Sequence, residues 1–147
     1  MEIKKLDLID CHNRIKPLIH NTPVLTSSYI NELTEAEVYF KCENFQKMGA
    51  FKMRGAANAI LKLSDEQKCN GVVTHSSGNH AQAISLAAKK IGIKAYIVMP
   101  SNAPEIKKEA VKGYGGELIE CESNLEAREA AAKDLVHSKS ATFIHPS

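Results

Sequence analysis

Tryptophan is absent from this 147-residue sequence, and aromatic side chains make up only 5% of it. The charge is nearly balanced, with 19 lysine and arginine residues against 17 aspartate and glutamate residues. A protein that binds nucleic acid usually clusters basic charge and stacking aromatic rings on one face, so we expect no nucleic-acid partner. No apolar run approaches the roughly 18 residues of a membrane span, and residues 1–5 lack the apolar core of a signal peptide. We therefore expect no membrane partner either.

Paired cysteines are also missing, because no two of the four stand in a CxxC pattern. Irregular spacing of this kind is more typical of reduced cysteines inside a cell than of a disulfide framework. A zinc site would need paired ligand spacing, which the cysteines and the six dispersed histidines do not supply. We expect no metal site within this chain and a cytoplasmic location. The cysteines are Cys11, Cys42, Cys69 and Cys121.

Short apolar segments and amphipathic segments alternate from residue 71 onward. Such alternation implies right-handed β-α-β units and a parallel sheet with helices on both faces. We therefore predict an α/β fold in which residues 71–147 form a small domain with a four-stranded parallel sheet. The predicted strands are 71–74, 94–99, 117–121 and 142–145, and the predicted helices are 79–91, 104–114 and 123–137, the last capped by Ser123.

Residues 1–70 do not have the pattern of a complete domain. We predict helices over 6–19 and 51–63, a short helix capped by Ser64, and two isolated strands over 24–25 and 37–42. These elements are too few to bury a core of their own, so we expect this part to expose apolar surface.

A strand–loop–helix junction at residues 74–80 is crowded with small polar side chains. The unpaired N–H groups and the partial positive charge at a helix N-terminus can bind a carboxylate or a phosphate. Ser76, Ser77 and Asn79 would add hydrogen bonds to that anion. Helix capping by the same side chains is the simpler alternative, and the two roles are compatible.

Lys52 follows Gly49 and opens a predicted helix. A cation at a helix N-terminus is unfavourable, and a lysine whose pKa is depressed suits Schiff-base chemistry. Most lysines are only solvated surface charges, so this pattern alone is weak. The sequence contains no GxxxxGK[ST], no GxGxxG and no GxSxG motif.

Two segments in this order resemble known motifs. ENFQKMGAFKMRGA at 43–56 resembles the lysine motif of the fold-type II pyridoxal phosphate enzymes, and HSSGNHAQ at 75–82 resembles the substrate-carboxylate loop of their serine/threonine dehydratase family, most closely in its serine racemases. The resemblance implies a tryptophan synthase beta-like fold. It covers only the N-terminal part of such enzymes, so we expect a truncated chain in which residues 1–70 are an incomplete piece of the large cofactor-binding domain.

The resemblance also implies roles for individual residues. Lys52 would bind pyridoxal 5'-phosphate as a Schiff base and act as a base on one face of the substrate Cα, and Ser77 would be the acid or base on the other face. Phe51 and Asn79 would contact the cofactor. The substrate serine or threonine would be bound by Ser76, Ser77, Asn79 and His80. The expected reactions are serine racemisation and elimination to a keto acid and ammonia.

Effectors and assembly are implied in the same way. ATP would bind at Ser27, Ser28, Lys47, Gln82 and Tyr114. The ligands for Mg or Ca and the glycine-rich loop for the cofactor phosphate would lie outside this chain, and the full-length protein would be a homodimer. The sequence departs from the family pattern at Met48, Ala50 and Ser147, where relatives commonly have threonine, serine and asparagine.

Three alternatives accompany this interpretation. The chain could come from a threonine dehydratase without racemase activity, since such enzymes tend to have alanine at the position of Ser77. It could also be a non-catalytic α/β module that retains only the anion-binding turn. A cysteine synthase relative is disfavoured by Gln46-Lys47 together with Ser76-Ser77.

Overall fold

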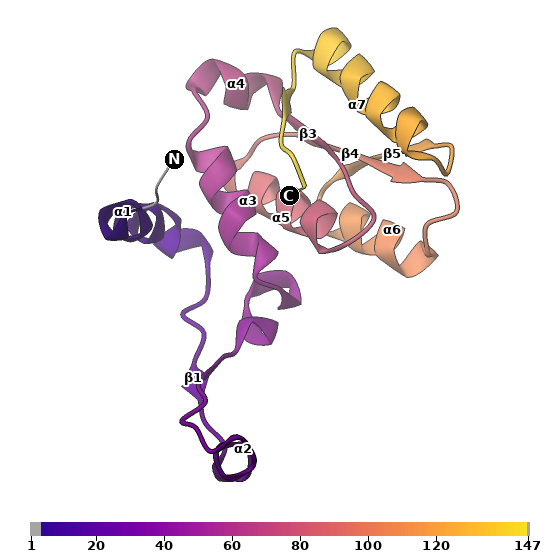
Figure 1. Ribbon diagram of the computed structural model, residues 1–147. Coiled ribbons are helices and arrows are strands. Elements are labelled where there is room, and N and C mark those ends of the chain that lie inside the picture. Colours follow the sequence, from indigo (N-terminus) through magenta and orange to yellow (C-terminus); the bar gives the residue numbers. More distant parts are fainter. Residues whose placement is uncertain (1–3, 147) are drawn as a thin grey trace.

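A computed structural model describes residues 4–146 (Figure 1). Four parallel strands form its main sheet in the spatial order β5-β4-β3-β6. The expected α/β fold with a four-stranded parallel sheet is therefore confirmed. The strands are β3 (Val72–His75), β4 (Ala95–Pro100), β5 (Glu117–Cys121) and β6 (Thr142–Phe143).

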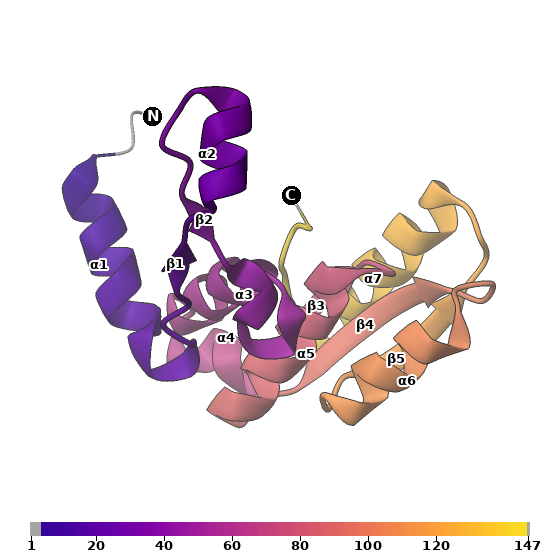
Figure 2. The ribbon, with the colours of Figure 1, turned by 90° about the horizontal axis from the view of Figure 1, so that it is seen from below.

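Helices pack on both faces of this sheet (Figure 2). Side chains alternate along a strand, so Val72 and Ile97 join one core with α5 (Asn79–Ile91) and α6 (Glu105–Gly113). Val73 and Val98 point the other way and pack against α7 (Leu125–Lys139). This double covering explains why β3 and β4 consist of almost uninterrupted apolar residues.

Gly116, directly before β5, lies against side chains of α5, α6 and β4. A Cβ atom built there would clash with Ser85 Oγ and would lie 2.9 Å from Val111 Cγ1 and 3.0 Å from Ile97 Cγ1. Only glycine leaves room for this contact. Gly116 therefore allows α5, α6 and β4 to pack together at this position.

Several predicted boundaries in this part of the chain differ from the structure by one or two residues. Asn124, not Ser123, caps α7, because its side-chain oxygen accepts the Ala127 N–H at 2.7 Å. Strand β6 ends at Phe143 rather than at residue 145, since only Thr142 and Phe143 pair with β3. Strand β3 extends one residue further than predicted, to His75.

The N-terminal part contains more structure than the sequence pattern predicts. The two strands predicted to be isolated form an antiparallel pair, with Val24 opposite Lys41, and the second is only two residues long. A helix capped by Ser27 went unpredicted, because seven mostly polar residues carry little periodic signal. The elements are α1 (Lys5–Ile15), η1 (Lys16–Leu18), β1 (Val24–Leu25), α2 (Ser28–Thr34), β2 (Phe40–Lys41), η2 (Glu43–Phe45), η3 (Lys47–Gly49), α3 (Lys52–Leu61) and α4 (Asp65–Asn70).

Helix α3 belongs to the same core as the sheet. Its residues Met53, Ala56 and Ile60 are buried with Val72 and with the alanines of α5. The elements before α3 expose large apolar side chains instead, among them Leu6, Leu8, Val24, Leu25, Tyr29, Leu33 and Phe40. A division between domains at residue 70 stays a prediction. Within residues 4–146 no helix is both long and apolar enough to cross a membrane.

Candidate active site

The two segments singled out in the sequence lie together in the structure. Helix α3 begins at Lys52 and packs along α5, which begins at Asn79. The Lys52 ammonium donates a hydrogen bond to the backbone carbonyl of Pro146 at 2.8 Å, just beyond β6. The lysine, the polar loop after β3 and the end of β6 therefore meet at the carboxyl edge of the sheet, where open parallel sheets bind ligands.

Phe51 lies beside the lysine on the outer surface. Its side chain is 60% exposed, and the Lys52 nitrogen lies 5.6 Å from the ring centroid. Such an arrangement permits a cation–π contact. An exposed ring next to a primary amine also offers an apolar surface for a flat, aromatic aldehyde.

The turn before Lys52 has an unusual backbone. Met48 and Gly49 both have positive φ values, 56° and 76°, and for a side chain as large as methionine this conformation is strained. Gln46 is buried and anchors the turn, because its side-chain amide accepts the His20 N–H at 2.7 Å and donates to the His20 carbonyl at 2.9 Å. The two bonds attach the turn to the chain just before β1.

Glu43 and Arg54 form a two-point ion pair across the same turn. The Arg54 guanidinium donates to both Glu43 carboxylate oxygens, at 2.7 and 2.8 Å, and the Thr22 hydroxyl donates to one of them at 2.6 Å. The Arg54 hydrogen bond is the main cause that lowers the pKa of Glu43 from 4.5 to about 2. Sequence analysis did not pair these residues, because they are eleven positions apart and follow no motif rule.

The Glu43 pair predicts a pH-dependent stability. A carboxyl whose pKa falls from 4.5 to about 2 on folding stabilises the fold above its unfolded pKa, and this gain disappears as the pH falls toward the folded value. We expect Glu43→Gln to lower the free energy of unfolding by about 2 kcal/mol at pH 7, allowing for partial solvation. Urea titrations between pH 7 and pH 2.5 should show this difference shrinking; a constant difference would contradict the assignment.

The loop after β3 leaves the start of α5 open. The Ser76 N–H donates to the Val98 carbonyl at 3.1 Å, and the Ser76 hydroxyl accepts the Gly78 N–H at 3.3 Å. The helix is capped by Gly78, which has no side chain to accept the N–H groups of its first turn. Capping by Ser77 or Asn79, the simpler alternative from sequence, is therefore not what this helix uses. Its N-terminus is available to an anion.

His80 lies under this loop with only 8% of its surface exposed. Burial lowers the pKa of the imidazole, and the Lys52 charge lowers it further. The ring contacts the backbone of Ile144, while among the described residues Nε2 has no partner. A buried, unpartnered acceptor next to an open helix N-terminus is the type of atom that a ligand satisfies.

The residues expected to bind ATP lie on separate elements. Ser27 and Ser28 lie at the start of α2, whereas Tyr114 caps the end of α6, and the two helices are far apart in both views (Figures 1 and 2). Lys47 lies on η3, which contacts α5, the helix of Gln82. Burial and the neighbouring Lys90 lower the pKa of Lys47. Ser27 and Ser28 therefore lie apart from Tyr114 in this structure (Figures 1 and 2).

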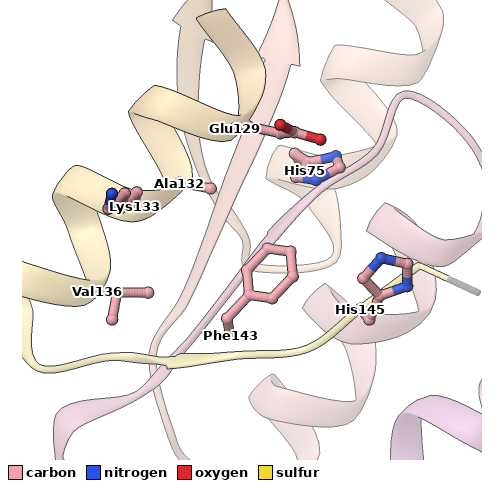
Figure 3. Close-up of a pocket in the computed structure, with 7 residues that line it drawn as sticks. All are labelled: His75, Glu129, Ala132, Lys133, Val136, Phe143 and His145. Atoms are coloured by element: carbon pink, nitrogen blue, oxygen red, sulfur yellow. The ribbon is translucent and has the colours of Figure 1, made fainter. Parts of the chain in front are cut away.

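A cavity that sequence analysis missed lies on the α7 face of the sheet (Figure 3). His75 opens onto this face because it alternates with Thr74, and its ring centroid is 5.5 Å from that of Phe143. Burial lowers the pKa of His75. Strand alternation alone could have indicated that this histidine faces away from the lysine. The volume is about 310 Å³, and the lining residues are His75, Glu129, Ala132, Lys133, Val136, Phe143 and His145.

Comparison with known proteins identifies the class. The family model described as "Pyridoxal-phosphate dependent enzyme" matches residues 15–147, and this chain belongs to that family. Among curated relatives, serine racemase from Dictyostelium discoideum is 54% identical over 140 residues, which cover 95% of this chain and 43% of the relative. The beta-hydroxyaspartate dehydratase of Paracoccus denitrificans is 50% identical, with 95% and 44% covered.

Solved structures agree with this assignment. The crystal structure of the Dictyostelium discoideum serine racemase matches with a TM-score of 0.92 and 53% identity, covering 96% of this chain and 46% of that one. A crystal structure of the T.th. threonine deaminase matches with a TM-score of 0.88 and 37% identity, covering 98% and 45%. The expected fold-type II architecture is confirmed. The chain spans less than half the length of these relatives.

The described residues fit part of a pyridoxal phosphate site. A primary amine, an exposed aromatic ring and an uncapped helix N-terminus meet at one edge of the sheet, and the buried Nε2 atom of His80 lacks a partner there. The amine suits the aldehyde of the cofactor, the aromatic ring suits the cofactor ring, and the helix N-terminus suits an anionic group. Ser147, which stands where relatives commonly have asparagine, lies outside the described residues.

Proposed function

We propose that this chain contributes the lysine-bearing part of a pyridoxal phosphate-dependent enzyme that interconverts L- and D-serine and eliminates ammonia from serine or threonine. The observation that carries the proposal is the position of Lys52, which opens α3 beside the uncapped N-terminus of α5. Relatives named serine racemase, at 49–54% identity, support the choice of substrate class.

Bound pyridoxal phosphate would act as the electron sink for the substrate's Cα electrons. Lys52 would hold the cofactor covalently and accept the Cα proton on its own face of the substrate. The open first turn of α5 and the side chains of Ser76 and Asn79 would bind the substrate carboxylate. His80, neutral and buried, would accept a hydrogen bond rather than add a charge.

Ser77 decides between the two reactions in this proposal. A planar carbon can be reprotonated on either face only if each face has its own proton donor. With Ser77 opposite Lys52, both faces are served and racemisation follows. With Lys52 alone, elimination is the natural outcome. Relatives named threonine deaminase and L-threo-3-hydroxyaspartate ammonia-lyase support including elimination in the proposal.

Assembly and regulation belong to the proposal as well. ATP at Ser27, Ser28, Lys47, Gln82 and Tyr114 would require a further chain or further residues to bring these separate elements into one site. A homodimer would supply such a surface, and the exposed apolar side chains of α1, β1 and α2 suit burial of that kind. The proposal also includes a divalent cation as a second effector, bound by ligands outside this chain. It places the protein in the cytoplasm.

The test is an assay of both reactions on protein expressed from its complete coding sequence. With pyridoxal phosphate and L-serine we expect D-serine and pyruvate, measured by chiral chromatography and by a coupled dehydrogenase. Pyruvate without D-serine would favour the dehydratase alternative. If a protein with a native circular dichroism spectrum forms neither product, the result would favour the non-catalytic module.

A further inference from the structure

The first turn of α3 has an electrostatic problem that its own residues do not solve. Lys52 and Arg54 both place positive charge near the helix N-terminus, while the first turn contains no acidic residue and no side-chain cap. Cations at this end of a helix are unfavourable. Glu43, on η2, supplies the missing negative charge through its two-point bond to Arg54.

The segment between Glu43 and Lys52 would not hold its shape unaided. It includes the two positive φ values at Met48 and Gly49. Of its residues only the partly buried Met48 packs against an apolar core, while Ala50 is buried outside both cores. Polar bonds anchor it at both ends. Glu43 joins it to Thr22 and Arg54, and Gln46 joins it to the backbone of His20.

We propose that Thr22, Glu43 and Arg54, here named the Glu43–Arg54 clamp, position the amine of Lys52 for reaction with a carbonyl compound. The clamp residues do not touch the amine; they act by fixing the turn and the helix end from which Lys52 extends to the Pro146 carbonyl. This inference rests on the proposed role of Lys52 as the cofactor lysine, and it adds positioning residues that determine where that amine lies.

The experiment measures the amine without any cofactor. Trace acylation with acetic anhydride, followed by mass spectrometry, gives the relative reactivity of every lysine in the unmodified protein and in Glu43→Gln. Loosening the clamp frees Lys52 from the Pro146 carbonyl, so we expect its labelling to rise about fivefold, the factor for one typical hydrogen bond. Lys62, at the other end of α3, should keep its reactivity.

A matched ion pair distant from the site serves as the control. Glu120 accepts a hydrogen bond from the buried Lys108 at 2.8 Å, a length like that of the clamp bonds. Glu120→Gln should raise the labelling of Lys108 and leave Lys52 unchanged. In Glu43→Gln combined with Arg54→Gln the same pair is lost as in the single variant, so the second substitution should add no further rise in Lys52 labelling.

Thr22→Val is the second variant. It is needed if Glu43→Gln fails to fold, because all lysines of an unfolded protein would be acylated to the same extent. Thr22→Val removes the hydroxyl that donates to Glu43 at 2.6 Å and accepts a longer bond from Arg54 at 3.4 Å. The shape is nearly constant, and Lys52 labelling should rise by about twofold. Equal Lys52 labelling in the unmodified protein and a folded variant, or an equal rise in Glu120→Gln, would overturn the positioning role. Failure of pyridoxal phosphate to react with Lys52 in the unmodified protein would instead overturn the proposed function, whatever the labelling shows.

Discussion

Lys52→Ala is expected to abolish both serine racemisation and elimination, with activity falling by at least about a thousandfold. The substitution removes the only amine that opens α3 and with it the covalent hold on the cofactor and one proton-transfer group. Borohydride reduction of the protein mixed with pyridoxal phosphate should fix the label on a peptide that contains Lys52, and the variant should lose this label.

Lys62→Ala is the matched control, because Lys62 is an exposed lysine at the C-terminal end of the same helix. It should keep the label, the yellow colour and both activities. If Lys52→Ala takes up as much label as the unmodified protein, Lys52 is not the lysine that binds the cofactor. The open N-terminus of α5 would then need another explanation.

Ser77→Ala is expected to separate the two reactions. D-serine formation should fall by about a hundredfold or more, the usual contribution of one general acid or base, while pyruvate release changes by no more than about threefold. The reason is that elimination needs a base on only one face of the substrate. Parallel assays of both products from one reaction mixture measure the ratio directly.

Ser101→Ala provides the comparison, since Ser101 is exposed in the turn after β4 and only its backbone is hydrogen-bonded. It should change neither product. Equal loss of D-serine and pyruvate in Ser77→Ala would contradict the two-face mechanism and would make Ser77 a substrate-binding residue alone.

Local patterns predicted the second half of the chain well. The predicted bounds of α5 and β5 match the structure, because a long amphipathic repeat and a short segment that begins directly after Gly115-Gly116 each carry a strong signal. The N-terminal part was harder. Helix α2 is short and mostly polar, and the pairing of β1 with β2 joins residues fifteen or seventeen positions apart that share no pattern.

The candidate site divides in the same way. Lys52, Ser76, Ser77 and Asn79 were proposed as site residues from sequence, because each stands in a motif of contiguous residues whose local geometry the chain itself sets. The Glu43–Arg54 pair was not predicted, because its members are eleven positions apart in that motif and meet only through the turn at Met48 and Gly49. The burial of His80 was not predicted either, because it depends on which distant segments pack against α5. The cavity beside His75 required the sheet order to place β6 next to β3.

The sequence by itself determined the α/β alternation and the two motifs that mark the family. It did so because periodicity, capping and turn chemistry act over a few residues. The tertiary structure decided which groups are satisfied and which are left available. The Lys52 amine bonds to Pro146 and the Glu43 carboxylate to Arg54, whereas Nε2 of His80 has no partner within residues 4–146. These depend on contacts between segments 11 to 94 residues apart, which no local pattern specifies.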